Sequence, residues 1–180
     1  MTRYVGIDPS TKTGIVVLDE NGNVKEQLEI VLENGILSSA EQLQDYGREI
    51  ANYANTPDVV CIEGFSFGSK GKAVSTQYGI GFAIRFALRD MGIKYIVPTP
   101  GQVKKFATGS GSSSKDNMVL PIFKKWGFEH DSDNVRDAFV LAQIARSLQG
   151  NTNTAKFQNE VIQAILNPAP KKGKGKVKTG

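Results

Sequence analysis

Three acidic residues are placed where their carboxylates could act together, although they are far apart in the sequence: Asp8, Glu63 and Asp137. Asp8 ends the apolar run 4–7, and Glu63 ends the β-branched run 58–62, so each acid closes a predicted strand. Asp137 lies one turn into a predicted helix. A buried carboxylate loses its hydration, which costs several kcal/mol unless a cation or hydrogen bonds compensate. The pattern therefore predicts a bound cation.

A hard divalent cation suits these residues because Mg²⁺ and Mn²⁺ prefer oxygen ligands. Two such ions about 3.5–4 Å apart could activate a water molecule and stabilise the leaving oxygen of a phosphodiester. We therefore expect Mg²⁺ as the cofactor, with Mn²⁺ as a substitute and two ions per site. A fourth ligand could come from Asp133 or Asn134, since both share a helix face with Asp137. Asp133 could equally be the N-cap of that helix.

The elements that must bring these acids together begin with a hairpin. Strand-like runs at 4–8 and 14–18 are followed by Asn21-Gly22, a dipeptide that tolerates positive φ and favours a tight turn. A third strand over 24–32 should therefore return antiparallel.

The rest of the chain alternates helix and strand. Ser38 and Glu41, three residues apart, resemble a capping box at the start of a helix. Further predicted elements are a strand over 58–62, a helix over 75–91, a strand over 94–97, and helices over 100–106, 115–126, 133–148 and 157–166. This order predicts an α/β fold: a mixed five-stranded sheet with helices on both faces and the first strand near its centre. Asp8 and Glu63 would then meet at the carboxyl ends of two neighbouring parallel strands.

Length and charge narrow the class of protein. The 180 residues suit one domain, which we place at 1–150, followed by an extension over 151–180 with a lysine-rich tail predicted to be flexible. Five of the 22 basic residues follow Pro170, where no acid occurs, so the rest of the chain has 17 basic residues against 18 acidic ones. A nucleic-acid site in that body must be a local patch. No stretch resembles a membrane helix or signal sequence, so we expect a cytoplasmic protein with no membrane partner.

Four single residues have plain structural interpretations. Cys61, the only cysteine, lies in an apolar run and is predicted to be a buried thiol. His130, the only histidine, is predicted on a surface loop rather than as a general base. Trp126 and Phe128 are predicted in the core.

Gly6-Ile7-Asp8-Pro9-Ser10, then Ile62-Glu63, then Asp137-Ala138 near the start of a helix resemble the RuvC-type Holliday junction resolvases of the ribonuclease H-like superfamily. The resemblance covers roughly residues 3–148. It implies a ribonuclease H-like fold and a structure-selective endonuclease that hydrolyses phosphodiester bonds in branched DNA such as four-way junctions. It also implies a homodimer that needs no nucleotide cofactor.

The resemblance carries over to individual residues. Asp8, Glu63 and Asp137 would be metal ligands, with Lys104 and Lys115 as catalytic partners on the phosphate side. A DNA-contacting loop would follow Glu63 and include Phe65, Phe67, Lys70 and Lys72. The helix with Tyr78, Phe82 and Phe86 matches the family's dimer helix. Interpreted without the family, the lysines could be a solvated face, and the two loop phenylalanines could simply pack the loop onto the body.

Two positions depart from the family's usual pattern. Ser10 stands where the family usually has glycine, and Asn134 stands where the cellular enzymes usually carry a fourth acid. This looser pattern and the lysine-rich tail look more like the phage-encoded branch, whose members would act in the cytoplasm of the host cell.

Two other functions fit parts of the sequence. Gly6-Ile7-Asp8 followed by Ser10, Thr11 and Thr13 also resembles the phosphate-binding hairpin of actin-like ATPases and sugar kinases. Those proteins need two such domains, and the motif has no second copy here. A non-catalytic module that binds branched DNA is the third possibility, and the intact set of three acids argues against it.

Overall fold

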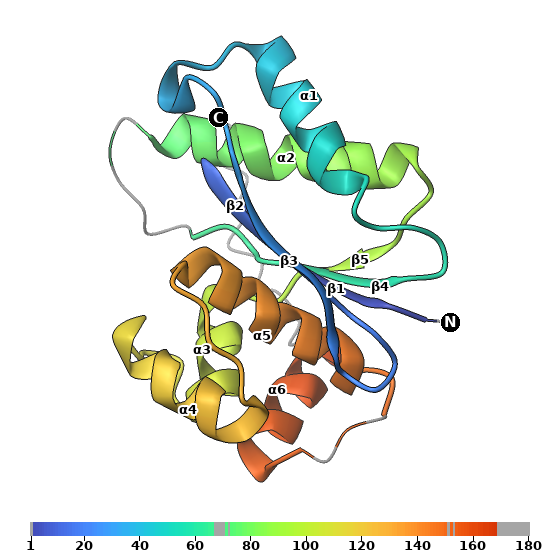
Figure 1. Ribbon diagram of the computed structural model, residues 1–180, viewed down its shortest axis with the longest axis vertical. Coiled ribbons are helices and arrows are strands. Elements are labelled where there is room, and N and C mark those ends of the chain that lie inside the picture. Colours follow the sequence, from blue (N-terminus) through green and yellow to red (C-terminus); the bar gives the residue numbers. More distant parts are fainter. Residues whose placement is uncertain (1, 67–70, 72, 151, 153, 169–180) are drawn as a thin grey trace, which may run out of the picture.

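The structure is a computed structural model that describes residues 2–66, 71, 73–150, 152 and 154–168. Its strands form one mixed sheet in the order β3-β2-β1-β4-β5, which Figure 1 shows crossing the middle of the molecule. β1 is central and pairs antiparallel with β2 and parallel with β4, as predicted. The strands are β1 (Tyr4–Asp8), β2 (Lys12–Leu18), β3 (Val24–Val31), β4 (Val59–Ile62) and β5 (Tyr95–Ile96).

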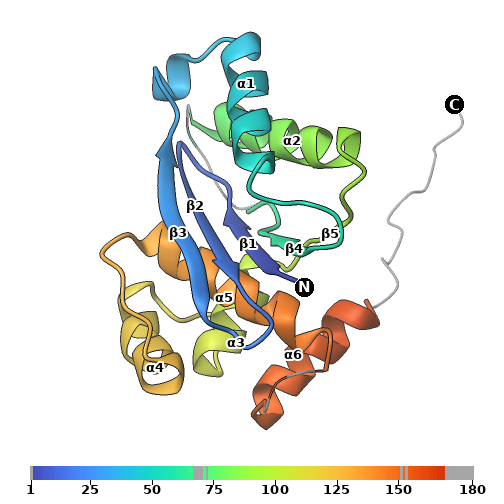
Figure 2. The same cartoon turned by 45° about the vertical axis from the view of Figure 1, so that its right-hand side comes forward.

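Helices cover both faces of this sheet, which confirms the predicted fold class (Figure 2). One face carries α1 (Ala40–Ala51), preceded by a 3₁₀ turn (Gly35–Leu37), and α2 (Val74–Asp90). The other face carries α3 (Pro100–Thr108), α4 (Asp116–Trp126), α5 (Asp133–Ser147) and α6 (Lys156–Leu166).

Each face of the sheet has its own apolar core, because successive strand residues point to opposite faces. Val5 and Ile7 of β1 pack toward α1 and α2. Tyr4 of the same strand packs toward α5, where it joins Cys61 and Phe139. The predicted buried thiol is therefore confirmed, and burial raises the pKa of Cys61.

Two helices are capped by a residue next to the one considered from the sequence. The capping box of α1 is formed by Ser39 and Gln42, not by Ser38 and Glu41. Ser38 instead donates its hydroxyl to the carbonyls of Glu33 and Gly35, which closes the preceding turn. The N-cap alternative considered for Asp133 is excluded, because Ser132 caps α5 by accepting from the Val135 amide.

Helix α2 buries only some of its apolar residues. Leu88 is buried together with Ile80 and Ile84, whereas Phe82 and Phe86 remain 46% and 61% exposed. The exposed rings stack on each other at 6.0 Å between centroids. Burial thus follows the side of the helix that faces the sheet, and the aromatic residues form an outer stripe.

The beginning of the C-terminal extension packs onto the domain. Val161 and Ile162 of α6 belong to the α5-side core. The buried Gln158 donates to the Phe106 carbonyl at 2.9 Å, which ties α6 to α3. The predicted lysine-rich tail after Pro170 lies outside the described residues. No helix in the described part of the chain is long and apolar enough to cross a membrane.

Glycines let α5 lie unusually close to the sheet. A Cβ on Gly6 of β1 would sit 1.9 Å from the Ala138 carbonyl oxygen, and one on Gly14 of β2 would sit 2.2 Å from the Asn134 carbonyl oxygen. Both obstacles are helix backbone, which cannot move aside as a side chain can. The distance between α5 and the sheet therefore depends on the absence of side chains at these two positions.

We expect Gly6→Ala to destabilise the protein by about 3 kcal/mol, the upper part of the range for overpacking, because the added methyl must push α5 off the sheet. The measurement is urea unfolding. Gly101→Ala is the matched control: its Cβ would meet nothing closer than 3.8 Å, so its free energy of unfolding should stay at or slightly above the wild-type value. Equal stabilities for the two variants would contradict this account of the packing.

Candidate active site

The first two acids lie side by side at the carboxyl ends of β1 and β4. These strands are parallel with Ile7 opposite Ile62, so Asp8 and Glu63 follow as the next residues. The Glu63 amide donates to the Ile7 carbonyl at 3.0 Å, which extends the pairing to the acid itself. Asp8 is only 6% exposed. The predicted meeting of these two acids is therefore seen in the structure.

Asp137 reaches the same place from α5, whose start lies on the side of the molecule where β1 and β4 end (Figure 1). Gly14 pairs with Asp8 across the hairpin, and the Asn134 carbonyl lies directly over Gly14. One turn further, the Ala138 carbonyl lies over Gly6. Asp137 falls between these two contacts and is 9% exposed. The close seat of α5 is what brings the third acid to the first two.

The crowding of these acids changes their acidity. Burial raises the pKa of Asp8 well above its usual range, and the charges of Glu63 and Asp137 add to this. Burial and the charge of Asp137 raise the pKa of Glu63 to about 7. Burial also raises the pKa of Asp137 to about 6, although Lys115 opposes that shift. Such shifts indicate carboxylates that lack enough positive charge around them.

Lys115 supplies part of that positive charge. It precedes α4, and its ammonium group pairs with Asp133 and lies 3.8 Å from Asp137 Oδ2. Burial alone would lower the pKa of Lys115, but its bond to Asp133 and the charges of Asp137 and Asp8 raise it. Lys104, half-buried on α3, is close enough to lower the pKa of Glu63 and Asp137. Both predicted lysines thus lie beside the acids.

The donor set can be tested against a metal ion. Within the described residues, no three His, Cys, Asp or Glu side chains converge, as they stand, on a point where they could hold a metal. The donor chemistry nevertheless fits a hard divalent cation: three buried carboxylates share one site, and their pKa values are raised because their charge is undercompensated. Asp137 faces the Lys115 ammonium, whereas the carboxyl groups of Asp8 and Glu63 share a hydrogen bond. A bound cation would offset the negative charge that the three groups carry when they are ionised.

The two candidates for a fourth ligand have different partners. Asp133 pairs with Lys115, which lowers its pKa. Asn134 donates its side-chain amide to Glu29 Oε2 at 3.3 Å, and the same oxygen accepts the Ser132 hydroxyl. Glu29 lies on β3 directly opposite Gly14, in one row with Asp8. Glu29 accepts the hydrogen bond of the Asn134 side-chain nitrogen, so the side-chain oxygen Oδ1 of Asn134 is available to another partner.

The loop after Glu63 is described only in part. Phe65 packs on Tyr78 and Phe82 of α2, with ring centroids 4.9 Å apart in both pairs. Its ring also lies over the guanidinium of Arg85. Of the residues predicted to contact DNA in this loop, Phe67, Lys70 and Lys72 lie outside the described residues.

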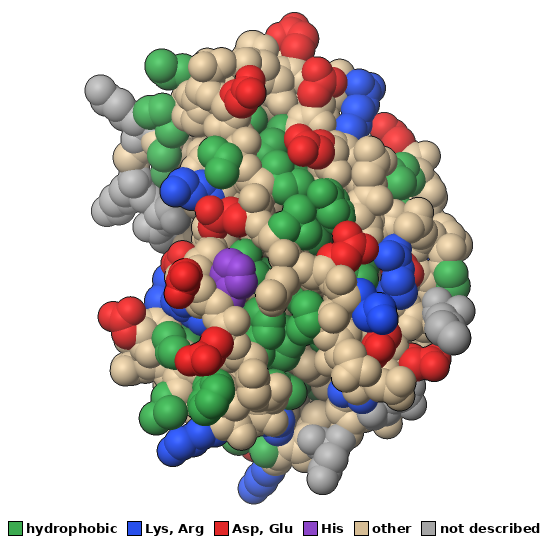
Figure 3. Space-filling view, viewed as in Figure 1, with side chains coloured by type: hydrophobic (Ala, Val, Ile, Leu, Met, Phe, Trp, Pro, Cys, Tyr) green, Lys and Arg blue, Asp and Glu red, His purple; other side chains and the backbone are tan. Residues whose placement is uncertain are grey.

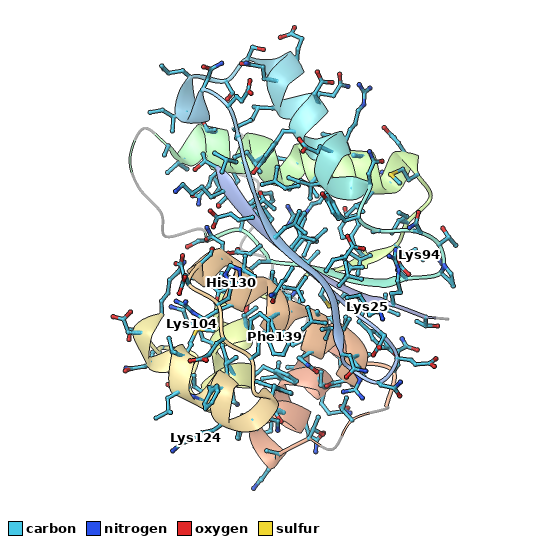
Figure 4. The ribbon with its side chains drawn as sticks, viewed as in Figure 1. Lys25, Lys94, Lys104, Lys124, His130 and Phe139 are labelled. Carbon is cyan, nitrogen blue, oxygen red and sulfur yellow. The ribbon has the colours of Figure 1, made fainter. Side chains whose placement is uncertain are left out.

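Other polar residues near the site have structural partners or lie at the surface. Figure 4 shows His130 near the start of α5, on the same side as the catalytic candidate Lys104, and Lys124 pointing outward from α4. His130 lies in the loop before α5, where Nδ1 accepts from the Ser132 amide at 3.0 Å, and it is visible at the surface in Figure 3. Lys125 bonds Gln158 on α6. On the face drawn in Figure 3, acidic and basic side chains are interspersed, as the balanced charge of the body predicts.

Sequence reasoning missed Glu29 and Arg85. Glu29 lies within a predicted strand and carried no motif, and the residues it faces depend on the register of the hairpin, which shifts at Val17/Leu18. Arg85 sits among the apolar residues of α2 and gave no signal of its own. Trp126 and Phe128, predicted in the core, do pack against Phe139, with centroids 5.8 and 3.9 Å away.

Comparison with known proteins gives one consistent family. No family model matches the chain. The crossover junction endodeoxyribonuclease RuvC of Paenarthrobacter aurescens is 30% identical over 134 residues, which cover 68% of this chain and 68% of that protein. RuvC of Corynebacterium efficiens is 27% identical over 78% of this chain and 66% of its own length. RuvC of Synechococcus sp. is 22% identical over 78% of this chain and 95% of its own length.

Solved structures show the same fold. Thermus thermophilus RuvC superimposes with a TM-score of 0.66 and 17% identity, covering 85% of this chain and 99% of that one. The T. thermophilus RuvC chain in complex with a Holliday junction substrate gives a TM-score of 0.62, with 86% and 100% covered. The fold, the placement of the acids and the sequence matches agree, and the chain belongs to the RuvC family of crossover junction endodeoxyribonucleases.

Proposed function

We propose that this protein is a Holliday junction resolvase that hydrolyses phosphodiester bonds in four-way DNA junctions with the help of divalent metal ions. The proposal rests mainly on one observation: Asp8, Glu63 and Asp137 converge at the carboxyl ends of β1 and β4, in a chain of the RuvC family. Neither the kinase-like nor the non-catalytic alternative accounts for both of these facts.

The metal, Mg²⁺ or Mn²⁺, would be held by the carboxylates of Asp8, Glu63 and Asp137. The side-chain oxygen Oδ1 of Asn134 would be a further ligand. When bound, the metal supplies the positive charge that activates water and stabilises the leaving oxygen. Glu29 accepts the hydrogen bond of the Asn134 amide nitrogen, which would leave the side-chain oxygen of Asn134 to act as this ligand. Asp133 serves instead as the partner that holds Lys115 beside the site.

The two lysines of the site would bind the DNA phosphate. Lys115 is half-exposed, and its long side chain can move from the carboxylates to an arriving phosphate. Lys104, on the first helix after β5, adds a second positive charge at the same edge. Charge-assisted hydrogen bonds from these ammonium groups would orient the phosphate and offset its charge.

We expect Asp8→Asn to slow the cutting of a synthetic four-way junction in Mg²⁺ by at least about 100-fold, because even residues that only support metal ligands contribute 10–100-fold. Junction binding, measured by fluorescence anisotropy in Ca²⁺, should stay at the wild-type level or become tighter, since a negative charge near the phosphate is removed.

Asp45→Asn is the control for this substitution, since Asp45 lies exposed on α1. It should cut the junction at the wild-type rate. An active Asp8→Asn variant would refute the assignment of the site. A wild-type protein that binds the junction but does not cut it with Mg²⁺ or Mn²⁺ would favour the non-catalytic module.

We expect Glu29→Ala to weaken the binding of Mn²⁺ to the DNA-free protein by about 10-fold, because Asn134 loses the partner that orients its amide. Isothermal titration calorimetry measures this directly. Glu26→Ala is the control on the same strand, since Glu26 pairs with Arg3 at 3.7 Å and should leave Mn²⁺ affinity unchanged. Equal affinities for all three proteins would exclude Asn134 as a ligand held by Glu29.

A homodimer would supply two equivalent sites for the two opposed strands of a junction. The stripe of Phe82 and Phe86 offers an apolar surface for the second copy. Beside it lies a groove of about 310 Å³ between α1 and α2, lined by Leu43 and Ala83 among others. Burying both aromatic rings against a partner would supply the driving force for association.

We expect the wild-type protein to sediment as a dimer and Phe86→Glu to sediment as a monomer, because a charge in an apolar interface is desolvated without a partner. Leu120→Glu is the control: Leu120 is 56% exposed on α4, on the other face of the sheet. That variant should remain dimeric. A monomeric wild-type protein, free and on a junction, would refute the dimer.

A further inference from the structure

Arg85 is a buried charge that the proposed mechanism does not use. It lies in the middle of α2 and is 7% exposed. Among the described residues, no acidic side chain lies within ion-pair distance of its guanidinium, and burial lowers its pKa. A buried cation without a carboxylate partner costs free energy, so its contacts must compensate in another way.

The contacts of Arg85 point to the active site. Its Nη2 donates to the Glu63 carbonyl at 2.8 Å, and its Nη1 donates to the Gly81 carbonyl at 2.7 Å. The Glu63 amide is bonded to Ile7, so this arginine fixes the other side of the same residue. The main chain of a proposed metal ligand is therefore held between β1 and α2.

The same guanidinium supports Phe65. Its central carbon lies 4.4 Å from the centroid of the Phe65 ring. Phe65, Arg85 and Glu63 line one cavity of about 60 Å³. Phe65 is only half-buried, so one part of the ring remains accessible while another rests on the arginine.

Gly81 makes room for this stack. A Cβ at this position would lie 2.4 Å from Phe65 Cε1 and 2.8 Å from Arg85 Nη1. Both atoms are ends of side chains, so a methyl group there would displace the ring and the guanidinium while leaving the helix backbone in place. The glycine thus offers a second way to disturb the pair without removing its charge.

We propose that Arg85 is a positioning residue that links Phe65 to Glu63, so that contact of branched DNA with the Phe65 ring and the placement of the Glu63 carboxylate are one structural unit. This inference rests on the proposed function, and it adds a residue outside the set of acids and lysines. DNA that presses on the ring moves the guanidinium, and the guanidinium is bonded to the main chain of the acid.

The test compares wild type with Arg85→Lys and Gly81→Ala, with Arg89→Lys as the control, because Arg89 is exposed on the same helix. Lysine keeps the charge of Arg85 but lacks the planar fork that reaches two carbonyls and a ring. Three readouts are measured well below the melting temperature of every variant: Mn²⁺ affinity of the DNA-free protein, junction affinity in Ca²⁺, and the single-turnover cutting rate in Mg²⁺.

We expect both Arg85→Lys and Gly81→Ala to weaken Mn²⁺ binding and to slow cutting by about 10-fold or more. Junction affinity should stay within about twofold of wild type in Arg85→Lys and fall further in Gly81→Ala, whose added methyl displaces the ring that contacts DNA. Arg89→Lys should match wild type in all three. In addition, the double variant Phe65→Leu/Arg85→Lys should cut no more slowly than the slower single variant, because the two residues act as one unit.

Two results would overturn the inference: Mn²⁺ affinity in Arg85→Lys equal to that in Arg89→Lys, or rate losses that simply multiply in the double variant. Failure of the proposed function would look different. If the wild-type protein cut no junction, the proposed nuclease activity would be refuted. The Mn²⁺ titrations would still show whether Arg85 positions Glu63.

Discussion

The site depends on the contact between α5 and the glycines of the first hairpin. Gly6 and Gly14 let the helix backbone rest on the sheet, with helix carbonyls where Cβ atoms would otherwise be. A helix that packs through side chains lies several ångströms further away. At that distance Asp137 would not share an environment with Asp8 and Glu63. One close packing contact therefore sets the charge density of the whole site, including the raised pKa values.

The high negative charge of the three acids explains which groups surround them. Three carboxylates in one buried place attract the nearest cation, and in the described structure that role falls to Lys115. Asp133 and Glu29 then have complementary tasks at the start of α5. Asp133 holds the lysine, and Glu29 holds the Asn134 amide together with the Ser132 cap. The first turn of α5 thus contains the cap of the helix and also the residues that hold the charged and polar groups around the acids.

On the other face of the sheet, α2 serves two purposes. Its inner side, with Ile80 and Ile84, builds a core, and its outer side carries the exposed stripe of Phe82 and Phe86. Arg85 lies between these sides and connects the helix to the end of β4. The proposed dimer surface, the loop aromatic and one acid are therefore attached to a single rigid element.

The sequence alone determined the fold class, the central position of the first strand and the meeting of Asp8 with Glu63, because strand patterns, an Asn-Gly turn and strand-end acids are local signals. It also indicated Asp137, Lys104 and Lys115, through their likeness to a family. The sequence placed the cap of α1 one residue too early, because two neighbouring serines, Ser38 and Ser39, can both cap a helix.

Only the tertiary structure could reveal the parts played by Glu29, Arg85 and Gly81. Glu29 reaches the site through hairpin register, and Arg85 through the packing of α2 against the end of β4. Such contacts join residues that are distant in sequence, and no periodicity records them. The same holds for the seat of α5: the sequence shows two glycines in strands, but only the packed helix shows why no side chain fits there.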